Sequence, residues 1–154
     1  MKAMLIPVEG EPRRVDVEGL DDLQRLVGGN IEAFPVYDSR GWTVYVNDDG
    51  LFGSEPNRAV FADTDMEDSG YPSQMDGHAI RNGELYTVLF GPIVAVGFDA
   101  EEGTDVDLTD EQEAEIAEIF GEDGPSRPGS GLAAVVLLKL DIQVDASTVA
   151  RVIG

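Results

Sequence analysis

The sequence contains no cysteine and only one histidine, His78. Without cysteine there is no disulfide framework and no thiol chemistry, which fits a reducing compartment. Long apolar runs are also lacking: the longest, residues 132–138, has the length of a buried strand and falls well short of a membrane span. The first residues are too short and too soon acidic for a signal peptide. We therefore expect a soluble, cytoplasmic protein without membrane contact.

Basic residues are scarce. Lys and Arg number 10 against 31 Asp and Glu, which gives a formal net charge of −21. The acid is concentrated, because residues 101–124 contain 11 acidic and no basic side chains, whereas residues 125–154 come to +1. A field of this sign repels nucleic acid and anionic membranes and attracts basic protein surfaces. The predicted partner is a basic protein surface, with no direct binding of nucleic acid.

The apolar pattern predicts an α+β fold. With 154 residues and 42% apolar composition, one folded domain is expected. Residues 85–98 form an apolar stretch that Gly91-Pro92 interrupts, so either a bent strand or two short strands is expected. Residues 62–83 are polar and have no sustained period, so a long loop is predicted there. Strands are predicted at 2–8, 13–17, 31–37 and 42–47, and a short helix from Leu20 to Val27 that ends at Gly28-Gly29. Together these elements predict a small, mostly antiparallel sheet with two short helices.

The second helix is predicted at residues 110–120. Thr109 and Gln112 have the spacing of a capping box, and Gly121 marks the end. At 100° per residue, Ile116, Ile119 and Phe120 share one side. The opposite side is almost entirely carboxylate: Asp110, Glu111, Glu115 and Glu118.

The last thirty residues predict a separate organisation. Residues 1–124 are expected to form a single α+β domain, and residues 121–131, rich in Gly and Pro, a linker. Leu132–Val144 is predicted to be a closing strand, and Asp145 to Thr148 to cap a last helical turn that runs through Ile153. This segment is too small for its own core, so it packs on the same sheet or on a second subunit, the latter giving a homodimer.

Five blocks of the sequence resemble a known family. They are residues 2–7 (KAMLIP), 23–32 (LQRLVGGNIE), 45–50 (YVNDDG), 56–59 (PNRA) and 91–97 (GPIVAVG). Over roughly residues 2–108 the chain resembles a family of small uncharacterised proteins carried by phages, plasmids and integrated elements of bacteria. The resemblance implies a mobile-element origin, a location inside a host cell and a small α+β domain, but no activity. The 62–83 loop is longer than the family pattern, and the segment from Pro125 onward is additional.

Several residue clusters are candidates for chemistry. Residues 63–68 (DTDMED) space carboxylates like the start of a calcium loop, but Asp68 stands where the loop needs Gly and Gln74 where it needs Glu. His78 could serve as a general base, although no nucleophile lies at recognisable spacing. A small metal-dependent or small-molecule enzyme using Asp63, Asp65 and His78 is therefore the alternative function. No P-loop or dinucleotide motif is present, and no cofactor is predicted.

Other polar and aromatic residues allow two interpretations each. Asn57 and Arg58 form a candidate ligand contact, since the planar guanidinium binds carboxylate or phosphate. Their alternative role is structural, with Arg58 paired to an acidic neighbour. Trp42, Tyr45 and Phe52 favour core packing over ligand stacking.

The carboxylates of the acidic segment are the predicted partner-binding residues. Five acids on the 110–120 helix average about 3.3 Å of rise each, close to the roughly 3.4 Å spacing of phosphates on one DNA strand. The favoured function is a non-enzymatic accessory protein that binds a host protein, in one version by mimicking nucleic acid. Adaptation to high salt, without any partner, is a third interpretation. The predicted set is Asp110, Glu111, Glu115, Glu118, Glu101, Glu102 and Asp105.

Overall fold

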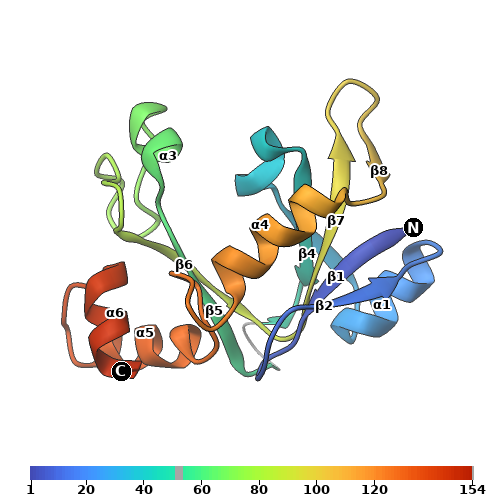
Figure 1. Cartoon of the computed structure of the whole chain (residues 1–154). Helices are drawn as coiled ribbons and strands as arrows, with labels where there is room; N and C mark the ends of the chain where they lie inside the picture. Colours follow the sequence, from blue (N-terminus) through green and yellow to red (C-terminus); the bar gives the residue numbers. More distant parts are fainter. Residues whose placement is uncertain (51–53, 154) are drawn as a thin grey trace.

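The structure is a computed structural model that describes residues 1–50 and 54–153. Phe52, which the sequence placed in an aromatic cluster, lies outside the described residues. The largest element is a six-stranded sheet, with its strands in the order β2-β1-β7-β4-β3 and β8 paired to β7 (Figure 1). All of its pairings are antiparallel. The predicted α+β class is confirmed. The strands are β1 (Lys2–Ile6), β2 (Arg13–Asp16), β3 (Ile31–Phe34), β4 (Trp42–Asn47), β7 (Ile93–Asp99) and β8 (Thr104–Val106).

The central strands of this sheet are buried on both faces. In β1, Ala3 and Leu5 point to one side and Met4 and Ile6 to the other, because successive side chains of a strand alternate. The first side is covered by helix α1 (Leu20–Val27), which ends at Gly28 in the left-handed conformation. Strands β1 and β2, which pair as the first hairpin of the chain, therefore lie where the sequence predicts strands. Helix α1 and its terminal glycine also lie where they were predicted.

Helix α4 (Asp110–Phe120) and a second, two-stranded sheet cover the other side. The helix starts with the predicted capping box, in which Thr109 and Gln112 exchange hydrogen bonds. Its Ile116 and Phe120 are fully buried with Trp42, which stacks on Tyr37 at a ring separation of 4.4 Å. The predicted core role of Trp42 is confirmed.

The second sheet pairs β5 (Pro56–Phe61) with β6 (Leu85–Phe90). The apolar stretch at 85–98 is thus two strands in two different sheets, because Gly91 turns the chain in the left-handed conformation between β6 and β7. Val60 of β5 faces the main core, and Ala59 faces away from it. The sequence did not predict β5 as a strand.

The C-terminal segment is helical, so the predicted strand at Leu132–Val144 is wrong. Helix α5 (Ser130–Lys139) packs Ala133, Ala134 and Leu137 against the outer side of the β5–β6 sheet (Figure 1). An apolar run of this length fits a buried helix as well as a strand, and small residues on one side allow close contact with a sheet. The Ser130 hydroxyl accepts a hydrogen bond from the Ala59 amide at 2.9 Å, which satisfies an edge donor of β5.

Helix α6 (Ala146–Ile153) begins where the sequence predicts it. The Asp145 carboxylate accepts hydrogen bonds from the Thr148 amide and the Ser147 hydroxyl, and these bonds lower the pKa of Asp145. The segment from residue 125 onward returns to the β5–β6 sheet of its own chain. The sequence left open whether this segment packs on its own chain or on a second subunit. The contacts with its own chain are present.

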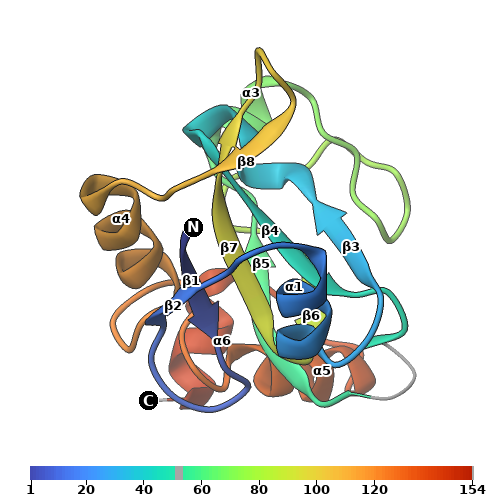
Figure 2. The ribbon, with the colours of Figure 1, turned by 90° about the vertical axis from the view of Figure 1, so that its right-hand side faces the viewer.

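Two shorter elements also differ from prediction. Residues Pro35–Arg40 form a 3-10 helix (η1) and end the strand that was predicted to reach residue 37, since a proline cannot donate to a sheet. Within the predicted loop 62–83, Thr64–Asp68 form the short helix α3, which the Asp63 side chain caps at the Met66 amide. Figure 2 shows α4 and β3 on opposite sides of the molecule, with α1 against the sheet between them.

Candidate functional site

The carboxylates of the β7–β8 turn, of the link between β8 and α4, of α4 and of the turn after α4 follow one another along the chain. We call the exposed members the acidic face. None of them takes part in an ion pair within residues 1–50 and 54–153. The sequence predicted five of them, namely Glu101, Glu102, Asp110, Glu111 and Glu118. The full acidic face comprises Glu101, Glu102, Asp107, Asp110, Glu111, Glu118, Glu122 and Asp123.

The side of α4 that faces the protein also carries acid, but there it is neutralised. Glu113 is buried and accepts two hydrogen bonds from Arg14 of β2, at 2.9 Å and 2.7 Å. This two-pronged contact raises the pKa of the Arg14 guanidinium, chiefly through the hydrogen bonds to Glu113. It ties the helix to the edge of the main sheet.

Glu115 is a predicted partner-binding residue that the fold uses internally. Its carboxylate accepts a hydrogen bond from the Trp42 indole at 2.8 Å and pairs with Arg40 at 3.3 Å. Arg40 also pairs with Asp63 at 2.7 Å, so one guanidinium joins α4, η1 and the start of α3. Because these contacts occupy its carboxylate, Glu115 does not belong to the acidic face.

Asp105 is committed in the same way. Both of its carboxylate oxygens lie 2.9 Å from the Tyr45 hydroxyl, which donates to them. Burial and this hydrogen bond raise the pKa of Tyr45. Two of the seven predicted partner-binding carboxylates therefore serve the fold.

Asn57 and Arg58, the candidate ligand contact, are both fully buried. The Arg58 guanidinium donates to the backbone carbonyls of Phe120, Pro7 and Gly10, at 3.1, 3.1 and 2.7 Å. Within residues 1–50 and 54–153 no carboxylate pairs with Arg58, so the predicted alternative of a pairing with an acidic neighbour is wrong. Burial lowers the pKa of Arg58 to about 10. The prediction that Asn57 and Arg58 contact a ligand is therefore wrong. Arg58 instead joins β5, the turn between β1 and β2, and the end of α4.

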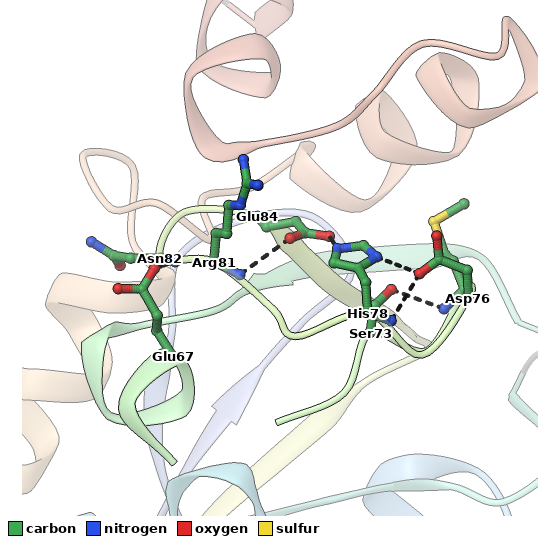
Figure 3. Close-up of polar contacts among 8 residues, drawn as sticks. Glu67, Ser73, Asp76, His78, Arg81, Asn82 and Glu84 are labelled. Carbon is green, nitrogen blue, oxygen red and sulfur yellow. Dashed lines mark hydrogen bonds and ion pairs between the residues drawn. The ribbon is translucent and has the colours of Figure 1, made fainter. Parts of the chain in front are cut away.

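His78 lies between two carboxylates (Figure 3). Its Nδ1 contacts Asp76, and its Nε2 lies 2.6 Å from Glu84 Oε2. Glu84 also accepts the Arg81 amide at 3.2 Å. The hydrogen bonds to Asp76 and then to Glu84 raise the pKa of His78, so the imidazolium form is stabilised. With both ring nitrogens in contact with carboxylates, the ring ties the 73–78 turn to Glu84, the residue before β6 (Leu85–Phe90).

A cleft of about 410 Å³ opens beside this histidine. The predicted enzyme residues do not meet there, since Asp63 caps α3 and pairs with Arg40 while His78 contacts Asp76 and Glu84. In the described part of the chain, no three His, Asp or Glu side chains converge as metal ligands. The carboxylates of Asp76 and Glu84 contact different ring nitrogens of His78.

The class of protein that these observations define is an acidic α+β protein whose exposed carboxylates on α4 and its flanking turns form no ion pair within the described residues. The chain belongs to a family described as a domain of unknown function, DUF3846, whose model matches residues 1–121. The predicted resemblance to an uncharacterised family is confirmed, and helices α5 and α6 lie beyond the matched residues. No curated protein and no solved structure gives a significant match. No helix in the described residues is long and apolar enough to cross a membrane.

Several residues of this region could not be found from the sequence. Arg14 and Glu113 are 99 positions apart, and Arg40 and Glu115 are 75 positions apart. Glu84 carried no motif that linked it to His78. The one sequence signal was the helical phase of Glu113, which falls nearer the apolar side of the helix than the other four acids of α4 do.

Proposed function

We propose that this chain is a non-enzymatic binding protein whose acidic face contacts a basic surface of another protein. One observation carries the proposal: the acids on the inner side of α4 are matched by Arg14 and Arg40, whereas those on the outer side are exposed and have no ion-pair partner in the part of the chain that the structure describes. The fold thus neutralises its acid where it must pack and leaves it exposed elsewhere. A partner would supply the missing positive charge.

Binding of this kind depends on the whole field more than on single contacts. An exposed ion pair contributes only about 0.2–1 kcal/mol, so several must act together. Regular phosphate mimicry along α4 is not part of the proposal. With Glu113 and Glu115 engaged, Asp110, Glu111 and Glu118 remain, at rises of about 1.5 and 10.5 Å. We infer a diffuse electrostatic surface that fits a basic patch, such as the groove of a nucleic-acid-binding protein.

The setting that we propose is a phage or other mobile element, where such a protein would act on a host protein in the cytoplasm. The five sequence blocks that resemble the family support this setting. A nucleic-acid-binding partner fits the same charge, because its own binding surface is basic.

A pair of triple variants tests the face. D110N/E111Q/E118Q removes three charges from the acidic face, and the control E32Q/D48N/D49N removes three exposed charges from β3 and the turn after β4. A fluorescent arginine-rich peptide is the probe, at about 50 mM and 300 mM salt. At about 0.5 kcal/mol for each lost pair, the face variant should bind roughly tenfold more weakly at low salt.

The control should lose less than about threefold, and binding of the original chain should weaken steeply with salt because screening cuts exposed electrostatics. Equal losses in both variants would show that net charge alone attracts the peptide. That result would favour general adaptation to high salt and would contradict a dedicated face.

A further inference from the structure

Helix α5 and Leu140, the residue that follows it, present an apolar stripe to solvent. Leu132, Val136 and Leu140 are 57%, 45% and 64% exposed, whereas Ala133, Ala134 and Leu137 are buried. Their spacing of four residues places them on one line along the helix. α5 contains no acidic residue, and Lys139 is its one charged side chain. A helix that is apolar all round is ordinarily covered on every side.

We propose that a second copy of this chain covers the stripe, with the two α5 helices antiparallel about a twofold axis at Val136. The stripe is self-complementary, because leucines stand four positions to either side of Val136. In a twofold contact each residue meets the residue at the mirrored position. Leu132 of one copy then packs against Leu140 of the other, and Val136 lies against its own counterpart.

The charge distribution favours a second copy of the chain over a basic partner as the occupant of this stripe. Two chains at −21 repel each other, so they associate at least cost where neither contributes net negative charge. Residues 125–154, which hold α5 and α6, come to +1, and the acids of other segments beside the stripe are Glu9 and Glu55 near Leu132. Residues 101–124 hold 11 acidic side chains and no basic one. A basic partner would instead be drawn to the acidic face.

The size of the stripe sets the expected strength. Together with Ile142, which is 43% exposed at one end, the stripe offers roughly 350 Å² of apolar surface, within the range of functional patches. A stable interface buries about 800 Å² on each partner, so flanking residues of α6 must supply the rest. Ile153, 38% exposed, lies at the other end of the stripe, near Gly129. We expect a dimer that forms at tens to hundreds of micromolar.

Single cysteines give a sharp test, because the chain has no cysteine of its own. On mild oxidation, Val136→Cys should form a disulfide dimer at least tenfold faster than Leu132→Cys or Leu140→Cys alone. In an antiparallel pair each of those two residues lies about 12 Å along the axis from its own counterpart, beyond disulfide reach. A mixture of the Leu132→Cys and Leu140→Cys chains should cross-link to each other. Self-cross-linking of Leu132→Cys at the rate of Val136→Cys would overturn the antiparallel arrangement.

Sedimentation equilibrium of the unmodified chain tests the dimer without any variant. Dimerisation should strengthen from 50 to 500 mM salt, because screening weakens the repulsion between two acidic bodies. Val136→Glu should abolish it, since two carboxylates would meet at the axis, while circular dichroism reports that the fold is kept. A monomer at 0.5 mM protein in 500 mM salt would refute the proposal, even if the stripe retained another protein.

This test is independent of the proposed function. The acidic-face variant D110N/E111Q/E118Q should dimerise at least as well as the original chain, because it carries less repelling charge. Peptide binding at the acidic face weakens with salt and dimerisation strengthens, so failure of one leaves the other standing.

Discussion

Replacing Arg58 with methionine tests whether this buried cation holds the fold together. Methionine retains much of the side-chain volume but leaves three backbone carbonyls, those of Phe120, Pro7 and Gly10, without their donor. A buried acceptor that loses its partner costs about 1–3 kcal/mol, and this applies in full to the Phe120 carbonyl and in part to the half-buried carbonyls of Pro7 and Gly10. Relief from burying a charge offsets part of the sum, so we expect a net loss of about 3 kcal/mol in the free energy of unfolding.

The assay is urea unfolding at 25 °C, followed by tryptophan fluorescence of Trp42, the one tryptophan of the chain. Thermal unfolding should show a midpoint lower by about 6–12 °C, at roughly 2–4 °C for each kcal/mol in a chain of this size. Arg58→Lys should lie between the two proteins, because an ammonium keeps the charge but lacks the planar fork.

The matched control is Arg25→Met. Arg25 is 70% exposed and pairs with Asp22 at 2.9 Å on the surface of α1. Such pairs contribute little, so a change within about 0.5 kcal/mol is expected. If Arg58→Met cost no more than Arg25→Met, the guanidinium would not be organising the three segments, and the structural role assigned to it would be wrong.

Two further predictions concern the histidine and the helix contact. Because the folded pKa of His78 is raised, its contribution to stability is fully present below about pH 6.5 and is lost as the pH rises through the folded pKa. NMR titration should give a pKa above 6.5, and His78→Gln should flatten the pH dependence of unfolding in that window. An unchanged slope would contradict the ring contacts. Gly131→Ala should destabilise the chain by about 1–3 kcal/mol, since a Cβ there would lie 2.7 Å from the Asn57 carbonyl carbon in backbone that cannot easily yield; a thermal midpoint equal to that of the original chain would refute this close packing of α5 on β5.

Elements with a local cause could be predicted from the amino-acid sequence. The capping box of Thr109 and Gln112 and the glycine after Val27 are set by residues within one helical turn, so both helix boundaries were predictable. The net charge and its concentration in residues 101–124 were likewise readable, because they need no coordinates.

The joint roles of distant segments depend on how the chain packs. Leu132–Val144 had the length and composition of either a strand or a buried helix, and the β5–β6 sheet made it a helix by accepting its small residues. The roles of Arg58, Glu113 and Glu115 depend on partners tens of positions away, which no spacing in the sequence encodes. Which carboxylates remain free for a partner is therefore a property of packing, since each acid is exposed or neutralised according to the side of the helix that meets the core.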